Sequence, residues 1–292
     1  MGHVAILIDK KLYFSDVSQP FNIETLTWND LTYTGAPTKF YASACNGASN
    51  NDLFIFGGTP FGGTSNSFAV KYDINDQHWT EITSGENEPK GIDYTSCAKF
   101  NNRSIAIFGG RLLNNFTNDL WIFDLLDLKW SLNNAPHPFP YIWSCCAITL
   151  PDESILYIGG ISLNKNGTEH LWELNTNTSG PTPHHRYGFS AVLTSDKRII
   201  IFGGYSSTDF GDLWILDITT YQWSEGIITN PNGLRLSSHT ETFVDNYMII
   251  AFGGNNVTNF SLATYMLDVN KRDSYTWVTD FIPSTTNTTN FK

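Results

Sequence analysis

Short apolar runs alternate with polar, glycine- and asparagine-rich segments along the whole chain. Five of these runs end in a glycine doublet, whose first glycine stands at position 57, 109, 159, 203 or 253. The steps between these glycines are 52, 50, 44 and 50 residues, which indicates an internal repeat of about fifty residues. Apolar runs this short, bounded by turn-forming residues, predict β-strands rather than helices.

Three further landmarks keep phase with the glycine doublets. After each doublet and a polar loop comes a short strand, which ends at Asp73, Asp124, Asn175, Asp217 or Asp268. A tryptophan opens one more strand in four of the units, at Trp79, Trp130, Trp223 and Trp277. A strand rich in small residues precedes each doublet, at 42–45, 95–98, 144–147, 190–193 and 239–242. Each unit therefore predicts four short strands.

The landmarks also predict local roles. The glycines supply positive φ and let a neighbouring backbone approach closely. The Asp caps the turn between the third and fourth strands, and the Trp packs between adjacent sheets with an N–H that needs a partner. One such sheet cannot bury both of its faces, but repetition around an axis packs sheet against sheet.

Hydrophobic run, Gly-Gly, loop, Tyr/Trp-x-x-Asp, six residues and Trp together resemble the Kelch repeat. The segment 180–191, with its Pro-x-x-Arg-x-Gly-x-Ser pattern, resembles the stretch that opens Kelch units. The resemblance covers nearly the whole chain and implies an all-β Kelch β-propeller, a fold also found in the catalytic domain of fungal galactose oxidases.

We predict a single propeller over residues 1–282 with six blades, followed by a flexible tail over 283–292. The blades are expected at about 2–36, 37–88, 89–136, 137–180, 181–230 and 231–282. The first has no glycine doublet and is short, so we interpret it as degenerate, with a tail strand near Phe281 as one way to complete it. Because the chain begins inside a repeat motif, we expect the natural protein to extend upstream.

Charge and composition narrow the function. The chain of 292 residues carries 28 acidic and 17 basic side chains, a formal charge of −11, without a run of Lys or Arg. Binding to a nucleic-acid backbone needs clustered positive charge, so we expect no nucleic-acid partner. No apolar stretch is long enough to cross a membrane, so we expect no membrane insertion. The first residues lack the pattern of a signal peptide, and the compartment stays open.

The four cysteines, Cys45, Cys97, Cys145 and Cys146, fall on the predicted innermost strands. When Ser43, Ser96, Ser144 and Ser190 are aligned, Cys97 and Cys145 fall one place after the serine of their unit, and Cys45 and Cys146 two places after it. Equivalent positions in neighbouring blades should lie too far apart for a disulfide, because Cα atoms more than about 7 Å apart cannot be bridged. We therefore predict four thiols that behave as small apolar groups.

Catalytic patterns from the same superfamily do not fit. Galactose oxidases hold copper with two Tyr and two His, including an adjacent Tyr-His pair, and none of the seven histidines here follows a Tyr. Plant specifier proteins use Glu-x-x-x-Asp-x-x-x-His for iron; Glu241 and Asp245 match, but the third position is Ile249. We therefore predict no catalysis and no cofactor.

The sequence instead favours a monomeric binding module for a protein or peptide, with carbohydrate binding or copper-oxidase chemistry as the alternative. His184, His185 and Arg186 could bind a carboxylate or a metal, or form a connecting loop whose Arg packs across strands. Arg235 and Lys39 fall at matching places in other units. Since aromatic and Arg side chains anchor interfaces, the candidate binding residues are Lys39, Tyr94, Tyr141, Trp143, His184, His185, Arg186, Tyr187, Arg235 and His239.

Overall fold

The computed structural model describes residues 21–25, 35, 37–47, 52–60, 66–83, 87–113, 115–134, 140–163, 169–171, 181–255, 259–260 and 263–284. The regular elements in these segments are β-strands, apart from one turn of 3-10 helix, η1 (Ile23–Thr25). The predicted all-β class is confirmed. In the same segments, no helix has the length and apolarity that a membrane crossing requires.

Four antiparallel sheets of four strands each form the body of the described chain. The first consists of β2 (Lys39–Asn46), β3 (Asp52–Pro60), β4 (Ala69–Asp73) and β5 (His78–Ile82). The second consists of β7 (Ser96–Phe100), β8 (Ser104–Phe108), β11 (Leu120–Asp124) and β12 (Lys129–Asn133). The third consists of β18 (Ser190–Leu193), β19 (Arg198–Phe202), β20 (Leu213–Asp217) and β21 (Gln222–Gly226). The fourth consists of β22 (Thr240–Val244), β23 (Tyr247–Ala251), β26 (Thr264–Asp268) and β27 (Thr276–Val278).

Shorter pairings complete the described elements. The strands β14 (Cys146–Thr149) and β15 (Ile155–Ile158) pair between the second and third of these sheets. Three small sheets are formed by strands next to the glycine doublets. One consists of β6 (Ile92–Asp93), β9 (Arg111–Leu112) and β10 (Asn115–Phe116), and another of β13 (Ile142–Trp143), β16 (Ile161–Leu163) and β17 (Glu169–Leu171). The last is the pair β24 (Gly254–Asn255) and β25 (Asn259–Phe260). The first and last strands of the described chain pair with each other, β1 (Phe21–Asn22) with β28 (Asp280–Phe281).

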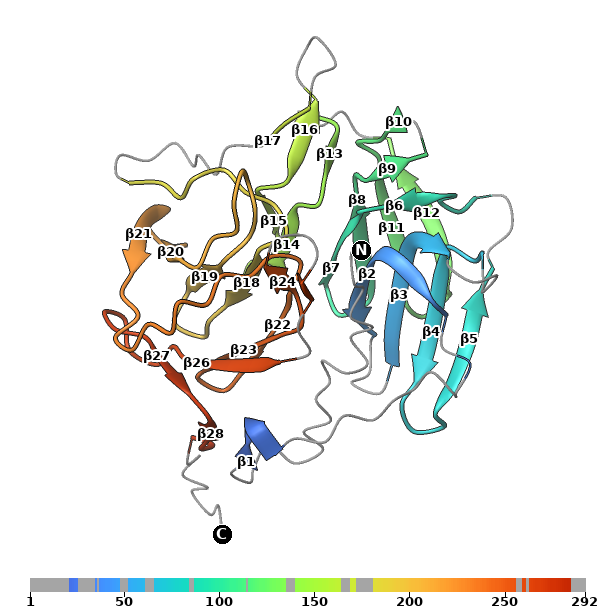
Figure 1. The fold of residues 1–292 in the computed structure, drawn as a ribbon. Coiled ribbons are helices and arrows are strands. Elements are labelled where there is room, and N and C mark those ends of the chain that lie inside the picture. The colour runs from blue at the N-terminus through green and yellow to red at the C-terminus, as the bar shows by residue number, and fades with distance from the viewer. Residues whose placement is uncertain are drawn as a thin grey trace.

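The sheets follow one another around a common centre (Figure 1). Their first strands face that centre and contact each other in chain order: β2 with β7, β7 with β14, β14 with β18, and β18 with β22. Apolar clusters fill the spaces between the first and second sheets, between β14–β15 and the third sheet, and between the third and fourth sheets. This is the sheet-on-sheet packing of a propeller. Six blades stays a prediction, since most of residues 2–36 lies outside the described segments.

Three of the glycine doublets bond their own unit to the next one. The N–H of Gly204, the second glycine of its doublet, donates to the carbonyl of Leu236 in the following unit at 2.8 Å. Gly203 has φ +67°, and a Cβ there would lie 2.4 Å from the same carbonyl oxygen. Equivalent bonds join Gly110 to Ile142 (3.0 Å) and Gly160 to Arg186 (3.1 Å). Only glycine combines this backbone conformation with so close an approach, which confirms the expected role of the doublets.

The predicted Asp caps are present. The Oδ1 of Asp124 accepts the N–H of Leu126 and of Asp127, at 2.9 and 3.0 Å, in the turn between β11 and β12. Asp73, Asp217 and Asp268 cap their turns in the same way. Each bond satisfies a turn N–H, which fixes the hairpin that leads into the outermost strand.

The predicted packing of the tryptophans between sheets is confirmed, but the predicted partner for the indole N–H is not. Trp130 packs in the cluster between the first and second sheets, with its ring 4.6 Å from that of Phe123, and Trp223 packs between β14–β15 and the third sheet. Their buried indole N–H groups, however, meet no acceptor among the described residues. The apolar bulk of the ring, rather than an N–H bond, explains these two positions.

The prediction of four thiols is wrong. Cys45 on β2 and Cys97 on β7 form a disulfide, with Cα atoms 6.4 Å apart. Cys45 pairs across its sheet with Phe54, and Cys97 with Ile107, and all four residues border the same cluster between the two sheets. A strand shows successive side chains on opposite faces. The one-residue offset between the two cysteines therefore points both into the same space between the sheets, and adjacent innermost strands lie close enough for a bridge.

Cys145 and Cys146 keep their thiols. Cys146 pairs with Ile158, the residue before a glycine doublet, as Ser43 pairs with Phe56. Cys146 rather than Ser144 therefore takes the place of Ser43 in this unit, and the alignment of Ser144 in the sequence analysis is wrong by two residues.

Candidate functional site

The candidate residues gather at one end of the sheets, which we call the loop face. In each four-stranded sheet the innermost strand runs away from this end and the next strand returns to it, where the glycine doublet stands. The loop face therefore carries the segments before the innermost strands and the segments after the doublets. Loops held on a rigid scaffold of this kind are where binding residues concentrate.

Five residues with left-handed backbone stand at the centre of the loop face, four of them two residues before an innermost strand and one as the third residue of β2. They are Tyr41, Tyr94, Ser144, Gly188 and Ser238, with φ between 54° and 62°. Backbone hydrogen bonds join three neighbouring pairs of these residues: Tyr94 N–H to Tyr41 O at 2.8 Å, Ser144 N–H to Tyr94 O at 3.1 Å, and Ser238 N–H to Gly188 O at 2.7 Å. The backbone geometry repeats, while the side chains differ from bulky to absent.

The bulky side of this centre is an aromatic and charged cluster. The rings of Tyr41 and Tyr94 stack with centroids 3.9 Å apart, and the Arg111 guanidinium lies 4.8 Å from the Tyr94 centroid. Arg111 also holds the buried Asp93 through two bonds of 2.9 and 3.1 Å, and Thr59 donates to the same carboxylate at 2.8 Å. Burial and the hydrogen bond with Tyr41 raise the pKa of Tyr94. Tyr94 therefore stays neutral, and the two stacked rings present aromatic surface.

Arg186 is part of the scaffold. Its side chain is 0% exposed and forms a bidentate pair with Asp212, at 2.5 and 2.9 Å. It also donates to the carbonyls of His184 and Gly203, both at 2.9 Å, and covers the ring of Phe210 at 4.1 Å. Burial would raise the pKa of Asp212, but the bonds and charge of Arg186 hold it below its ordinary value. The sequence left two roles open for Arg186, binding a ligand or packing across strands, and the structure shows the second.

The left-handed residues also correct the alignment of the cations. Arg186 stands two residues before Gly188, so its counterpart two residues before Ser238 is the buried Leu236, and the match with Arg235 is wrong by one residue. Lys39, two residues before Tyr41, does match Arg186.

Lys39 is likewise buried. Its Nζ donates to the carbonyl of Ser67 in the loop of its own sheet. Burial lowers the pKa of Lys39 to about 8, against the opposing charge of Glu81. Lys39, like Arg186, therefore contacts the protein rather than the surroundings.

The other candidates divide by exposure. Trp143 and His239 are buried: Trp143 stacks on Phe116 at 4.1 Å, and the Nε2 of His239 lies 2.8 Å from the Ser190 hydroxyl. Tyr187 is half-buried against Tyr205, and His185 is half-buried beside the exposed His184 at 3.9 Å. Tyr141 is 48% exposed.

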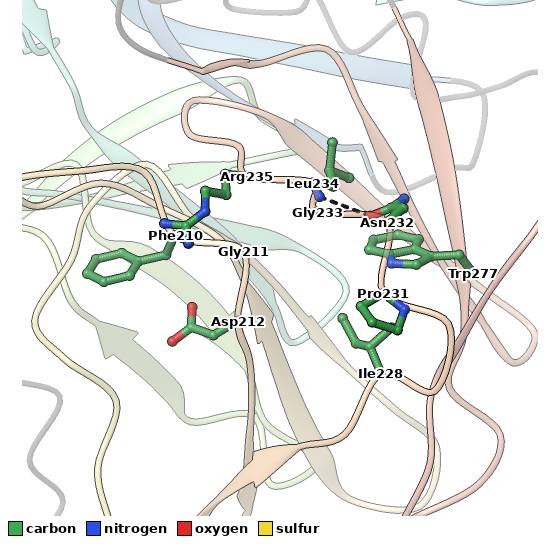
Figure 2. A pocket seen from close by; sticks show the side chains of 10 residues that line it. All are labelled: Phe210, Gly211, Asp212, Ile228, Pro231, Asn232, Gly233, Leu234, Arg235 and Trp277. Atoms are coloured by element: carbon green, nitrogen blue, oxygen red, sulfur yellow. Dashed lines mark hydrogen bonds between the residues drawn. The ribbon is translucent and has the colours of Figure 1, made fainter.

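Arg235 is exposed and lies in a groove at the seam between the third and fourth sheets (Figure 2). The groove holds about 350 Å³ and is lined by Phe210, Gly211, Asp212, Ile228, Pro231, Asn232, Gly233, Leu234, Arg235 and Trp277. Sequence reasoning did not find the groove, or the cluster around Arg111, because their members come from different units of the repeat. The one available signal for Arg111 was a basic residue directly after a glycine doublet.

The described segments bring together no three His, Cys, Asp or Glu side chains that could hold a metal ion. The site is thus built from aromatic rings, hydroxyls and guanidinium groups on rigid loops. Such groups recognise a partner by stacking, hydrogen bonding and charge.

Comparison with known proteins agrees with the geometry. A family model described as the KLHDC2/KLHL20/DRC7 Kelch-repeats domain matches residues 2–180 and 168–289. The chain belongs to the Kelch-repeat family. The resemblance inferred from the glycine doublets and tryptophans is confirmed.

Several named Kelch proteins are similar to this chain. Kelch domain-containing protein 10 of Rattus norvegicus is 26% identical over 232 residues, which cover 72% of this chain and 56% of the relative. Kelch domain-containing protein 1 of Homo sapiens is 24% identical over 292 residues, 87% of this chain and 71% of the relative. The host cell factor homolog hcf-1 of Caenorhabditis elegans is 24% identical over 237 residues, 69% of this chain and 30% of the relative. The chain spans about half the length of Kelch domain-containing protein 10.

Proposed function

We propose that this chain is a non-catalytic interaction module that binds a protein or peptide partner across the loop face. One observation carries the proposal. At the centre of this face the backbone contacts between units repeat, while the side chains at the same positions change from Tyr41 and Tyr94 to Ser144, Gly188 and Ser238. A rigid scaffold with variable side chains at one end suits recognition of a specific partner.

The chemistry of the exposed residues supports a polypeptide partner. Tyr141, His184 and Arg235 are exposed on the loop face, and Tyr187 and Tyr94 are half-buried there. Tyr and Arg are enriched where proteins bind each other, because they combine a large contact area with directional polar groups. Family membership points the same way, as the named relatives are Kelch-domain and host cell factor proteins.

Site-specific photo-crosslinking tests the proposal with a matched control. Tyr141 is 48% exposed on the loop face, and Tyr221 is 43% exposed in the turn between β20 and β21, at the opposite end of the sheets. Each is replaced in turn by p-benzoylphenylalanine, and the chain is irradiated in an extract of its native cells. Crosslinks to defined polypeptides from position 141, and not from 221, are expected. Crosslinks from 221 alone, or from neither position, would refute the loop face as the binding surface.

A further inference from the structure

The groove around Arg235 combines one charge with an apolar floor. One wall is the segment 210–212, after the third sheet's glycine doublet, and the other is the connection 228–235 that leads into the fourth sheet. Trp277 of β27 closes one end, and Pro231, Ile228 and Leu234 add apolar surface (Figure 2).

The charge in this groove is not cancelled by the protein. Asp212 faces the groove, but both of its oxygens accept from the buried Arg186. Arg235 is exposed and donates only weakly, to the carbonyl of Asp209 at 3.3 Å. Within the described segments no carboxylate lies at ion-pair distance from Arg235. On a chain with a formal charge of −11, this guanidinium is therefore a local cation that can hold a carboxylate through two parallel bonds.

The walls of the groove are held in place before any ligand arrives. The side chain of Asn230 donates to the carbonyl of Trp277 at 2.9 Å and accepts its N–H at 2.8 Å. The side chain of Asn232 accepts the N–H of Leu234 at 3.0 Å. Gly211 lets the two walls touch, since a Cβ there would lie 2.1 Å from the Leu234 carbonyl oxygen. A preformed groove loses less conformational entropy on binding.

We propose that this groove binds a short extended segment of a partner protein in which an acidic side chain lies next to an apolar one. The carboxylate pairs with Arg235, and the apolar side chain lies against Trp277 and Pro231. The assignment rests on the proposed function, since it names the peptide chemistry that one part of the loop face selects. A single cation on an acidic body does not suit a nucleic-acid backbone, which needs several.

The probe for this proposal is a random peptide library displayed on phage, selected on the whole chain. Selected peptides are synthesised with a fluorescent label, and their Kd values are measured by fluorescence anisotropy on the wild type, on Arg235→Glu and on Lys271→Glu. Lys271 is the matched control, because it is exposed in the turn between β26 and β27, at the opposite end of the fourth sheet. Circular dichroism melting of both variants confirms that they are folded.

We expect the selected peptides to share an acidic residue beside an aliphatic or aromatic one. Arg235→Glu should weaken their binding by about tenfold or more, as for loss of a charge-assisted hydrogen bond, and Lys271→Glu should leave it within about twofold. Peptides without an acidic residue, or with equal affinity for Arg235→Glu, would overturn the groove and leave the loop face as the binding surface. A library that yields no binder also overturns the groove, while photo-crosslinking at Tyr141 judges the wider function separately.

Discussion

Two pairs of neighbouring sheets are held together by different side-chain contacts, and we call the space between the sheets of each pair a joint. The joint between the third and fourth sheets, β18–β21 and β22–β27, is fastened at one end by a buried arginine. The joint between the first and second sheets, β2–β5 and β7–β12, is fastened by a disulfide and aromatic packing. Both fill the wedge between two twisted sheets around the same centre (Figure 1).

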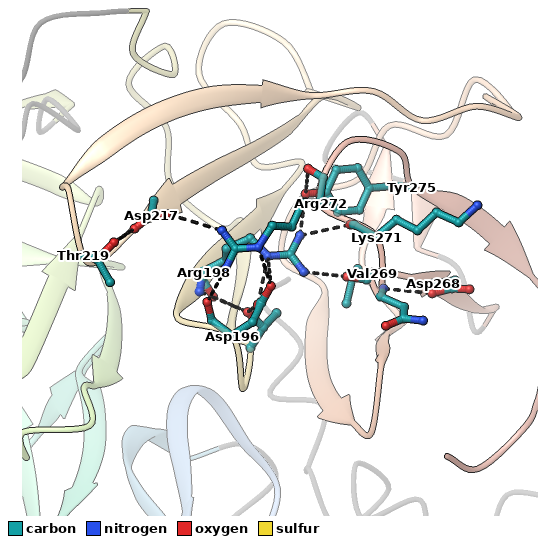
Figure 3. Close-up of polar contacts among 11 residues, drawn as sticks. Asp196, Arg198, Asp217, Thr219, Asp268, Val269, Lys271, Arg272 and Tyr275 are labelled. Carbon is teal, nitrogen blue, oxygen red and sulfur yellow. Dashed lines mark hydrogen bonds and ion pairs between the residues drawn. The ribbon is translucent and has the colours of Figure 1, made fainter. Parts of the chain in front are cut away.

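The arginine joint is polar and densely bonded (Figure 3). Arg198 is 4% exposed and donates across the joint to the carbonyls of Val269 and Lys271, at 2.8 and 3.1 Å, and to the Tyr275 hydroxyl at 2.8 Å. On its own side it pairs with Asp196 at 2.9 Å. Without the guanidinium, the carbonyls of Val269 and Lys271 would lose this donor, whereas Asp196 would keep its bonds to Thr194 and Arg272. Three of the bonds across the joint therefore come from this single side chain.

The disulfide joint spreads its contacts along two innermost strands. Besides Cys45–Cys97, the hydroxyl of Ser43 lies 3.0 Å from that of Thr95, and Lys99 donates to the carbonyl of Gly47 at 2.8 Å. Outside them, the rings of Phe54, Phe56, Phe123 and Trp130 pack with centroids between 4.6 and 6.0 Å apart. This joint has several independent contacts, so the loss of one should cost less. The comparison teaches that repetition fixes the backbone contacts, whereas each joint acquires its own side-chain chemistry.

The largest expected effect is at the arginine joint. Arg198→Met removes the guanidinium and leaves the carbonyls of Val269 and Lys271 without this donor, which should lower the free energy of unfolding by about 3–5 kcal/mol. Urea denaturation followed by tryptophan fluorescence measures it. The control is Arg272→Met, because Arg272 is exposed and pairs with the same Asp196 at 3.1 Å; we expect a loss below about 1 kcal/mol. Equal losses in the two variants would contradict the dependence on a single side chain.

Reduction of the disulfide should have the next largest effect. Opening the Cys45–Cys97 bridge releases a closed loop with a sequence separation of 52 and should cost about 2–4 kcal/mol. Urea denaturation with and without dithiothreitol measures this loss, and Cys145→Ser should show the same dependence on reductant. Alkylation after denaturation without reductant should label two cysteines. Labelling of all four would show that the bridge is absent.

The buried lysine of the first sheet gives a smaller, pH-dependent effect. The pKa of Lys39 is about 8 in the folded protein, below the unfolded value, because burial disfavours its charge. Between these two pKa values the unfolded chain binds the proton and the folded chain does not, so stability rises as pH increases from about 8 to about 10.5. At about 1.4 kcal/mol for each pKa unit, the gain is at most about 3 kcal/mol. Thermal melts of the wild type and of Lys39→Met across this pH range measure the gain. The rise due to Lys39 should be present in the wild type and absent in Lys39→Met.

The smallest expected effect is the loss of stability at acid pH (the acid limb of the pH–stability curve) that protonation of Asp212 causes. Its folded pKa lies below the ordinary value, so its contribution to stability is complete above the unfolded pKa near 4 and is lost as pH falls through the folded value. Melting curves between pH 5 and pH 2 are compared for the wild type and Asp212→Asn. A variant with the same acid limb as the wild type would show that the Arg186–Asp212 pair is not responsible.

Much of the fold could be predicted because its determinants are local. The glycine doublets, the Asp caps and the strand periodicity each act within a few residues, and in the described part of the chain they appear where the sequence predicts them. The strand end predicted at Asn175 lies outside the described residues. The binding residues were harder to predict. Lys39 and Arg186 were named as candidate binding residues and are buried. Burial depends on which loop folds over a side chain and not on its charge.

The sequence by itself determined that this chain repeats a four-stranded unit about every fifty residues and belongs to the Kelch family, because those signals lie in fixed local spacings. Only the tertiary structure decided that Cys45 bonds to Cys97, that Arg186 is buried in a pair with Asp212, and that Arg235 is exposed in a groove. A register offset of one residue turns a side chain to the opposite face of a strand, and contacts between units depend on that offset.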